Sequence, residues 1–88
     1  MAIEEQIEKG EPIETGIFIK TMTDRGISRH DAVHGATKIL LKMAYDAVHK
    51  LDYFDINKYQ ELLDKLRFFE PDEIEIELER ELNQYPLQ

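Results

Sequence analysis

The chain has 88 residues, of which 42% are hydrophobic and 34% charged, a composition that fits one small globular domain and excludes a second core. It contains no cysteine, which excludes disulfides and thiolate metal sites. The N-terminal residues lack the apolar core of a signal peptide, and no apolar run approaches the ~18 residues of a membrane span. We therefore expect a cytoplasmic protein without membrane contact.

Acidic residues are concentrated near the C-terminus. The net charge is −8, and the stretch from Glu70 to Glu81 holds seven acidic residues against Arg80 alone, a net −6. We treat residues 70–88 as an acidic C-terminal segment of the single domain 1–88. A basic stripe for phosphate contacts is absent from the sequence, so nucleic-acid binding is not expected.

The first half of the chain predicts two short helices. The first covers residues 3–9 and ends at Gly10, because glycine suits the position after a helix. The second covers residues 12–24, with Pro12 in its first turn and Gly26 after its end. Within it, residues 17–19 fit a short strand equally well.

A long helix is predicted over about residues 28–51. Ser28 is a suitable N-cap, and proline is absent up to residue 51. Apolar residues cover well over half of the circumference, which predicts a central helix with neighbours on several sides. These residues are Ala32, Val33, Ala36, Ile39, Leu40, Leu41, Met43, Ala44, Ala47, Val48 and Leu51.

Two further helices complete the predicted fold. Asp55 is a suitable N-cap for a helix over residues 56–69, and Pro71 fits the first turn of the next. Residues 73–78 alternate like a strand, but Ile74, Leu78 and Leu82 have helical spacing and glutamate favours a helix. Residues 85–88 form a tail. The expected core stripe of the fourth helix is Ile56, Tyr59, Leu62, Leu63, Leu66 and Phe69.

The predicted fold class is therefore all-α. We expect a small bundle of four to five helices around the long central helix.

His30 and His34 are the strongest candidates for a metal site. Their i, i+4 spacing places both imidazoles on one edge of the long helix, where they could share a divalent metal ion. Zinc or iron would need further ligands, which Glu4, Glu5 or Glu8 could supply from another helix. The alternative is two partly buried histidines that bond to neighbouring groups. Tyr45 lies near the same edge on a helical wheel and is a candidate neighbour of the site.

The acidic segment is a candidate partner-binding surface. Its simpler interpretation is a solvated helix face, and the sharper one is a docking surface for a basic protein. The residues assigned to that surface are Glu73, Glu77, Arg80 and Glu81.

One stretch resembles a known group of proteins. Residues 26–34 read G-I-S-R-H-D-A-V-H, and they are followed by Phe54-Asp55 and by the run from Tyr59 to Leu66. This pattern, over about residues 3–66, is similar to small bacterial helical proteins catalogued as a domain of unknown function. The resemblance implies a helical fold and a bacterial origin, and it brings no activity.

Three functions remain open. The first is a protein-interaction or regulatory module that binds a partner protein or a second copy of itself. The second is a metal- or small-ligand-binding protein that uses the histidine pair. The third is an enzyme with a pocket in the helical bundle around His30, His34 and Tyr45.

Overall fold

The protein is all-helical over the residues that its structure, a computed structural model, describes, namely 2–10, 12–49 and 53–82. The helices in those ranges are α1 (Ala2–Lys9), α2 (Ile13–Asp24), α3 (Arg29–His49), α4 (Ile56–Leu66) and α5 (Pro71–Leu82). The predicted fold class is confirmed, and residues 17–19 and 73–78 are helical. The predicted tail at 85–88 and Leu51 lie outside the described residues.

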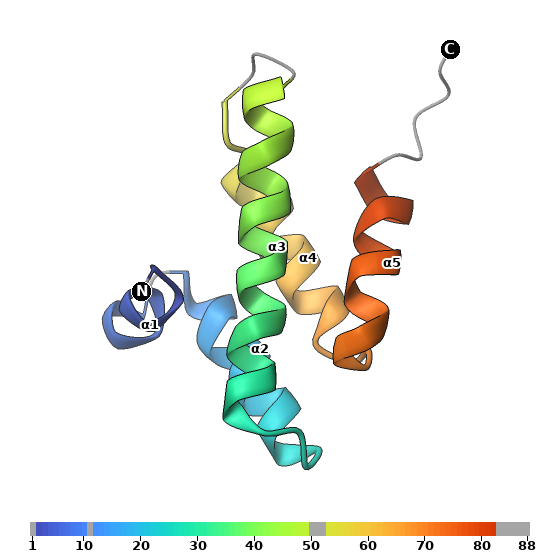
Figure 1. Cartoon of the computed structure of the whole chain (residues 1–88). Coiled ribbons are helices and arrows are strands. Elements are labelled where there is room, and N and C mark those ends of the chain that lie inside the picture. Colours follow the sequence, from blue (N-terminus) through green and yellow to red (C-terminus); the bar gives the residue numbers. More distant parts are fainter. Residues whose placement is uncertain (1, 11, 50–52, 83–88) are drawn as a thin grey trace.

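The helices form a flat molecule in which α3 is the longest element (Figure 1). It runs across α2 and α4, while α1 and α5 lie on its two sides. The principal extents are 40, 25 and 17 Å. The shortest extent matches two layers of helices, because packed helix axes lie about 10 Å apart. One face of α3 therefore looks out of the molecule rather than into a third layer.

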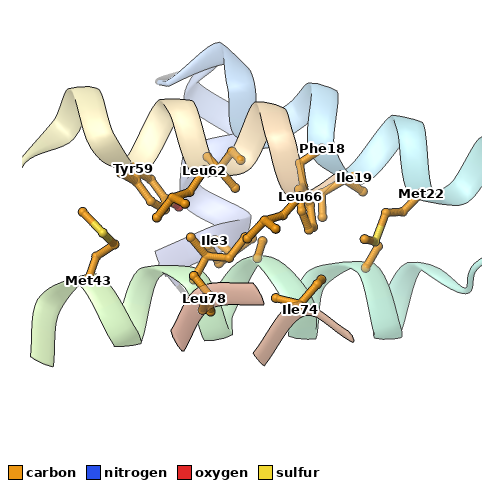
Figure 2. Close-up of a cluster of buried hydrophobic side chains, with 14 of the residues drawn as sticks. Ile3, Phe18, Ile19, Met22, Met43, Tyr59, Leu62, Leu66, Ile74 and Leu78 are labelled. Atoms are coloured by element: carbon orange, nitrogen blue, oxygen red, sulfur yellow. The ribbon is translucent and has the colours of Figure 1, made fainter. Parts of the chain in front are cut away.

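The core fills the space between α3 and the layer made by α2 and α4 (Figure 2). Ile3 of α1 reaches into it, and Ile74 and Leu78 close it from α5. All five helices thus contribute buried side chains, which lets so small a domain bury an adequate core. The largest of the fully enclosed side chains are Ile3, Thr15, Phe18, Met22, Ile39, Tyr59, Leu62, Leu63, Leu66, Ile74 and Leu78.

Gly35 lets three helices approach closely in the middle of this core. A Cβ atom at this position would lie 2.9 Å from Cδ1 of Ile74 and 3.4 Å from Cζ of Phe18. The distance to Ile74 is too short for ordinary van der Waals contact and that to Phe18 is at its lower limit, so the absence of a side chain lets α5 in particular pack closely against α3.

The predicted helix starts at Ser28 and Asp55 are confirmed. The backbone N–H of Asp31 donates to Oγ of Ser28 at 3.1 Å, and that of Lys58 donates to Oδ1 of Asp55 at 3.2 Å. Each side chain satisfies a donor that the first helical turn leaves without a partner. Between α2 and α3, Gly26 adopts a φ of 91°, a conformation that side-chain-bearing residues rarely adopt.

Two predicted helix boundaries are wrong. Pro12 has an extended conformation and precedes α2 instead of lying in its first turn. The fourth helix ends at Leu66 rather than at residue 69, and the carbonyls of the turn that follows it are bound by an arginine that directly follows α2. The Arg25 guanidinium donates to the carbonyl oxygens of Arg67 and Phe69 at 2.8 and 3.1 Å and pairs with Glu70 at 2.9 Å.

The apolar residues of α3 are not all covered, contrary to the sequence prediction. Leu41 is 62% exposed and Val48 71% exposed, because no third helical layer lies beyond α3 in the described part of the chain. Ile56, predicted to belong to the core stripe of α4, is also exposed, at the first position of that helix.

Candidate functional site

A groove lies between α3 and α5. It has a volume of about 410 Å³, within the usual range for binding sites. We call it the α3–α5 groove. Its lining residues are Lys38, Leu41, Lys42, Tyr45, Glu75, Leu78 and Glu79.

The two walls of the groove carry opposite charges. Lys38 and Lys42 belong to α3, whereas Glu75 and Glu79 belong to α5. One ion pair crosses between the walls, from Nζ of Lys38 to Oε1 of Glu75 at 3.9 Å. A pair this long with a largely exposed carboxylate contributes little to stability, so a binding partner can replace it at small cost.

An exposed apolar ridge runs along α3 beside the groove. Leu41, Tyr45 and Val48 follow one another at i, i+4 and i+7 and are 62%, 57% and 71% exposed. That spacing places three large side chains in one line on the outer face of the helix. We call these three residues the α3 ridge. Leu41 and Tyr45 also line the groove, so ridge and groove form one continuous surface.

Tyr45 is held by contacts within its own helix. Its ring stacks on that of His49, with centroids 4.0 Å apart, and Nζ of Lys42 lies 5.6 Å from its centroid. The Tyr45 ring is thus packed against its own helix while 57% of the residue stays exposed, and such amphipathic side chains are frequent in protein interfaces.

The two predicted metal ligands lie elsewhere on α3. His30 and His34 are exposed and line a separate hollow of about 230 Å³ with Val33 and Thr37. Glu4, one of the proposed third ligands, pairs with Arg29 at 2.6 Å. Over the described ranges, no three His, Asp or Glu side chains gather in a way that could hold a metal ion.

The structure does not bring Tyr45 to the histidines. Tyr45 lies eleven residues after His34 in the helix, a separation of about 16 Å at 1.5 Å per residue. It lines the α3–α5 groove, whereas both histidines line the other hollow.

The predicted partner-binding residues of α5 have partners inside the molecule. Oε1 of Glu73 accepts a hydrogen bond from the backbone of Glu70 at 3.2 Å, and Glu77 pairs with Arg80 at 3.1 Å. The Glu81 carboxylate binds Lys65 of α4 and lies 3.8 Å from Nζ of Lys58. Glu75 and Glu79, which line the groove, were not selected from the sequence.

The ion pair of Glu81 shifts the pKa values of both of its members. The hydrogen bond from Lys65 is the main cause that lowers the pKa of Glu81, and the charges of Lys65 and Lys58 add to the effect. The same hydrogen bond raises the pKa of Lys65. This pair fastens α5 to α4.

A buried polar cluster between α1, α2 and α4 was also not predicted from the sequence. Oε1 of Gln6 accepts hydrogen bonds from Oγ1 of Thr15 and from the hydroxyl of Tyr59, both at 2.8 Å. Burial raises the pKa of Tyr59 and outweighs the opposite effect of the neighbouring Thr15 and Gln6 side chains. Because both hydroxyls are already paired to one oxygen, we assign the cluster a role in holding α1 on the bundle.

No known protein family, curated protein or solved structure matches the chain. The resemblance of residues 3–66 to small bacterial helical proteins therefore stays a prediction. None of the described helices is both long and apolar enough to cross a membrane.

Proposed function

We propose that the protein is an interaction module that binds a partner protein through the α3 ridge and the adjoining α3–α5 groove. The observation that carries this proposal is the exposure of Leu41, Tyr45 and Val48 in one line. Single exposed apolar side chains are ordinary, but an aligned set next to a groove is typical of a binding surface. The groove adds polar groups at the rim, as protein interfaces commonly have.

The free energy available from burying the α3 ridge also supports its role as a binding surface. Burying a large aliphatic or aromatic side chain gains roughly 1.5–3 kcal/mol relative to leaving it in water. The three ridge side chains stay largely exposed to solvent, so the folded chain does not obtain this gain from them, although they belong to the longest helix. A partner that covers the ridge would recover it.

Site-specific photocrosslinking tests the proposal. A photoreactive phenylalanine analogue replaces Tyr45 in cells that express the protein naturally, and Phe68 serves as the matched control because it is also exposed, at 59%. We expect a discrete covalent adduct from position 45 that is absent from position 68. The adduct should disappear when Leu41→Asp is added.

The mass of the adduct identifies the kind of partner. An adduct of twice the chain mass of 10.4 kDa would mean that a second copy covers the ridge. Absence of any adduct specific to position 45, in protein that remains folded by circular dichroism, would refute the proposed function.

Metal or small-ligand binding by His30 and His34 is a second candidate function. The observation that favours it is that both imidazoles line one hollow. Zinc titration followed by calorimetry tests it, with His49→Ala as the control variant. Binding that survives in the control and is lost in His30→Ala/His34→Ala would support this function, and absence of binding to the unmodified protein would remove it.

A further inference from the structure

We propose that the occupant of the α3–α5 groove is an amphipathic helix that carries acidic residues on one side of its apolar stripe and basic residues on the other. This inference rests on the proposed function and names the chemistry of the partner. It is carried by the opposite charges of the two groove walls.

The apolar part of the surface has the dimensions of a helix-binding site. Leu41, Tyr45 and Val48 extend along α3 for seven residues, about 10 Å or two helical turns. Leu78 of α5 lies at the base of the groove and is almost fully buried. A helix placed alongside α3 can therefore set side chains at i, i+4 and i+7 between the ridge and Leu78.

The charged part of the surface selects the flanks of that helix. A helix lying in the groove has one flank toward α3 and the other toward α5. The flank near Lys38 and Lys42 is favoured when it is acidic, and the flank near Glu75 and Glu79 when it is basic. A helix with two acidic flanks would meet like charges on α5, and one with two basic flanks would meet them on α3.

Which flank of the partner helix is acidic and which is basic decides the direction in which the helix binds, but not its affinity. Exchanging the acidic and basic flanks of a helix is equivalent, for the groove, to turning that helix end over end. A partner with exchanged flanks can thus satisfy both walls by binding in the opposite direction. The informative comparison is therefore between mixed flanks and uniform flanks.

Three synthetic peptides test the inference against the full chain. They share leucines at i, i+4 and i+7, and their flanks are acidic and basic, both acidic, or both basic. Fluorescence anisotropy at near-physiological salt measures binding, since salt at that level screens the net charge of −8 over distances beyond about 8 Å. We expect the mixed peptide to bind about tenfold more tightly than either uniform peptide. This is the affinity difference that the summed free energies of several exposed ion pairs would give.

Charge reversal of one wall supplies the second measurement. In Lys38→Glu/Lys42→Glu both walls are acidic, so the peptide with two basic flanks should become the tightest ligand. The control variant is Lys9→Glu/Lys20→Glu, which changes the net charge equally at exposed positions away from the groove. It should keep the preference of the unmodified protein for the mixed peptide.

The results separate this inference from the proposed function. Equal affinities for the three peptides, all lost in Leu41→Asp, would overturn the charge assignment and leave the ridge as a docking surface. Failure of all three peptides to bind would overturn a helix as the occupant. In that case the proposed function is tested by the photocrosslink from position 45 alone, which does not require the partner to be a helix.

Discussion

At the scale of single residues, Gln6 connects parts of the chain that are distant in sequence. Its side-chain oxygen accepts from Thr15 of α2 and from Tyr59 of α4. Near it, Ile3 inserts into the core, and Glu4 pairs with Arg29 of α3. The short α1, with only eight residues, would be unstable alone, so these contacts account for its folding.

Removing the Tyr59 hydroxyl tests the polar cluster. Tyr59→Phe should lower the free energy of unfolding by about 1 kcal/mol, because one hydrogen bond is lost while the oxygen of Gln6 keeps its bond with Thr15. Gln6→Leu should cost more, about 2–3 kcal/mol, since it leaves two buried hydroxyls without their acceptor. Urea unfolding measures both. Tyr45→Phe is the control and should change stability by less than about 0.5 kcal/mol; an equal loss in the control would contradict the assignment.

Local sequence signals predicted the residues that act on their own helix, and they failed for residues that act across the fold. Ser28 and Asp55 cap helices that begin at the next residue, so their role is visible from spacing. Arg25 binds the carbonyl of Arg67, 42 residues away, and Gln6 binds Tyr59, 53 residues away. No sequence pattern near Arg25 predicts its contact with Arg67.

At the scale of elements, α5 carries two rows of glutamates that flank its buried stripe in equivalent ways. Glu75 and Glu79 each follow a buried residue, whereas Glu77 and Glu81 each precede one. Which row faces α3 and which faces α4 depends on how α5 is rotated in the bundle. The sequence does not contain that rotation, and for this reason the residues predicted for partner binding differ from those that line the groove.

The row that faces α4 gives stability a dependence on pH. The pKa of Glu81 is lowered in the folded protein, so its ion pair with Lys65 stabilises the fold above the ordinary pKa of a glutamate. That contribution disappears as the pH falls through the lowered pKa. Glu81→Gln should therefore be less stable than the unmodified protein at neutral pH, and the difference should vanish in acid.

Urea titrations at a series of pH values measure this difference, with Glu5→Gln as the control for an exposed glutamate on α1. The raised pKa of Lys65 acts in the other direction, since its contribution is lost only as the pH rises through that pKa. A difference between Glu81→Gln and the unmodified protein that persists unchanged into acid would show that the contact does not depend on charge.

At the scale of the whole molecule, the fold class and the order of helices were predictable, but the number of layers was not. The apolar arc of α3 indicates how much of the helix could be buried. It does not indicate how many neighbours exist to bury it. With a shortest extent of 17 Å, the described helices form two layers, and part of the arc faces outward as the ridge.

The two-layer arrangement predicts that similar leucines differ sharply in their effect on stability. Leu41→Ala should change the free energy of unfolding by less than about 0.5 kcal/mol, because the side chain is 62% exposed. Leu63→Ala should cost about 2–5 kcal/mol, because the side chain is fully buried and leaves a cavity. Thermal and urea unfolding compare the two. A large loss in Leu41→Ala would mean that the ridge serves folding rather than binding.

The concentration of negative charge on α5 and its entry turn has a kinetic consequence. Residues 70–81 carry a net −6 of the total charge of −8, and this segment includes Glu75 and Glu79 of the acidic groove wall. Such an uneven charge distribution orients an approaching partner before contact and accelerates encounter. The acidic helix would then govern how fast a complex forms, with a rate that falls as ionic strength rises, while Leu41, Tyr45 and Val48 govern how long it lasts.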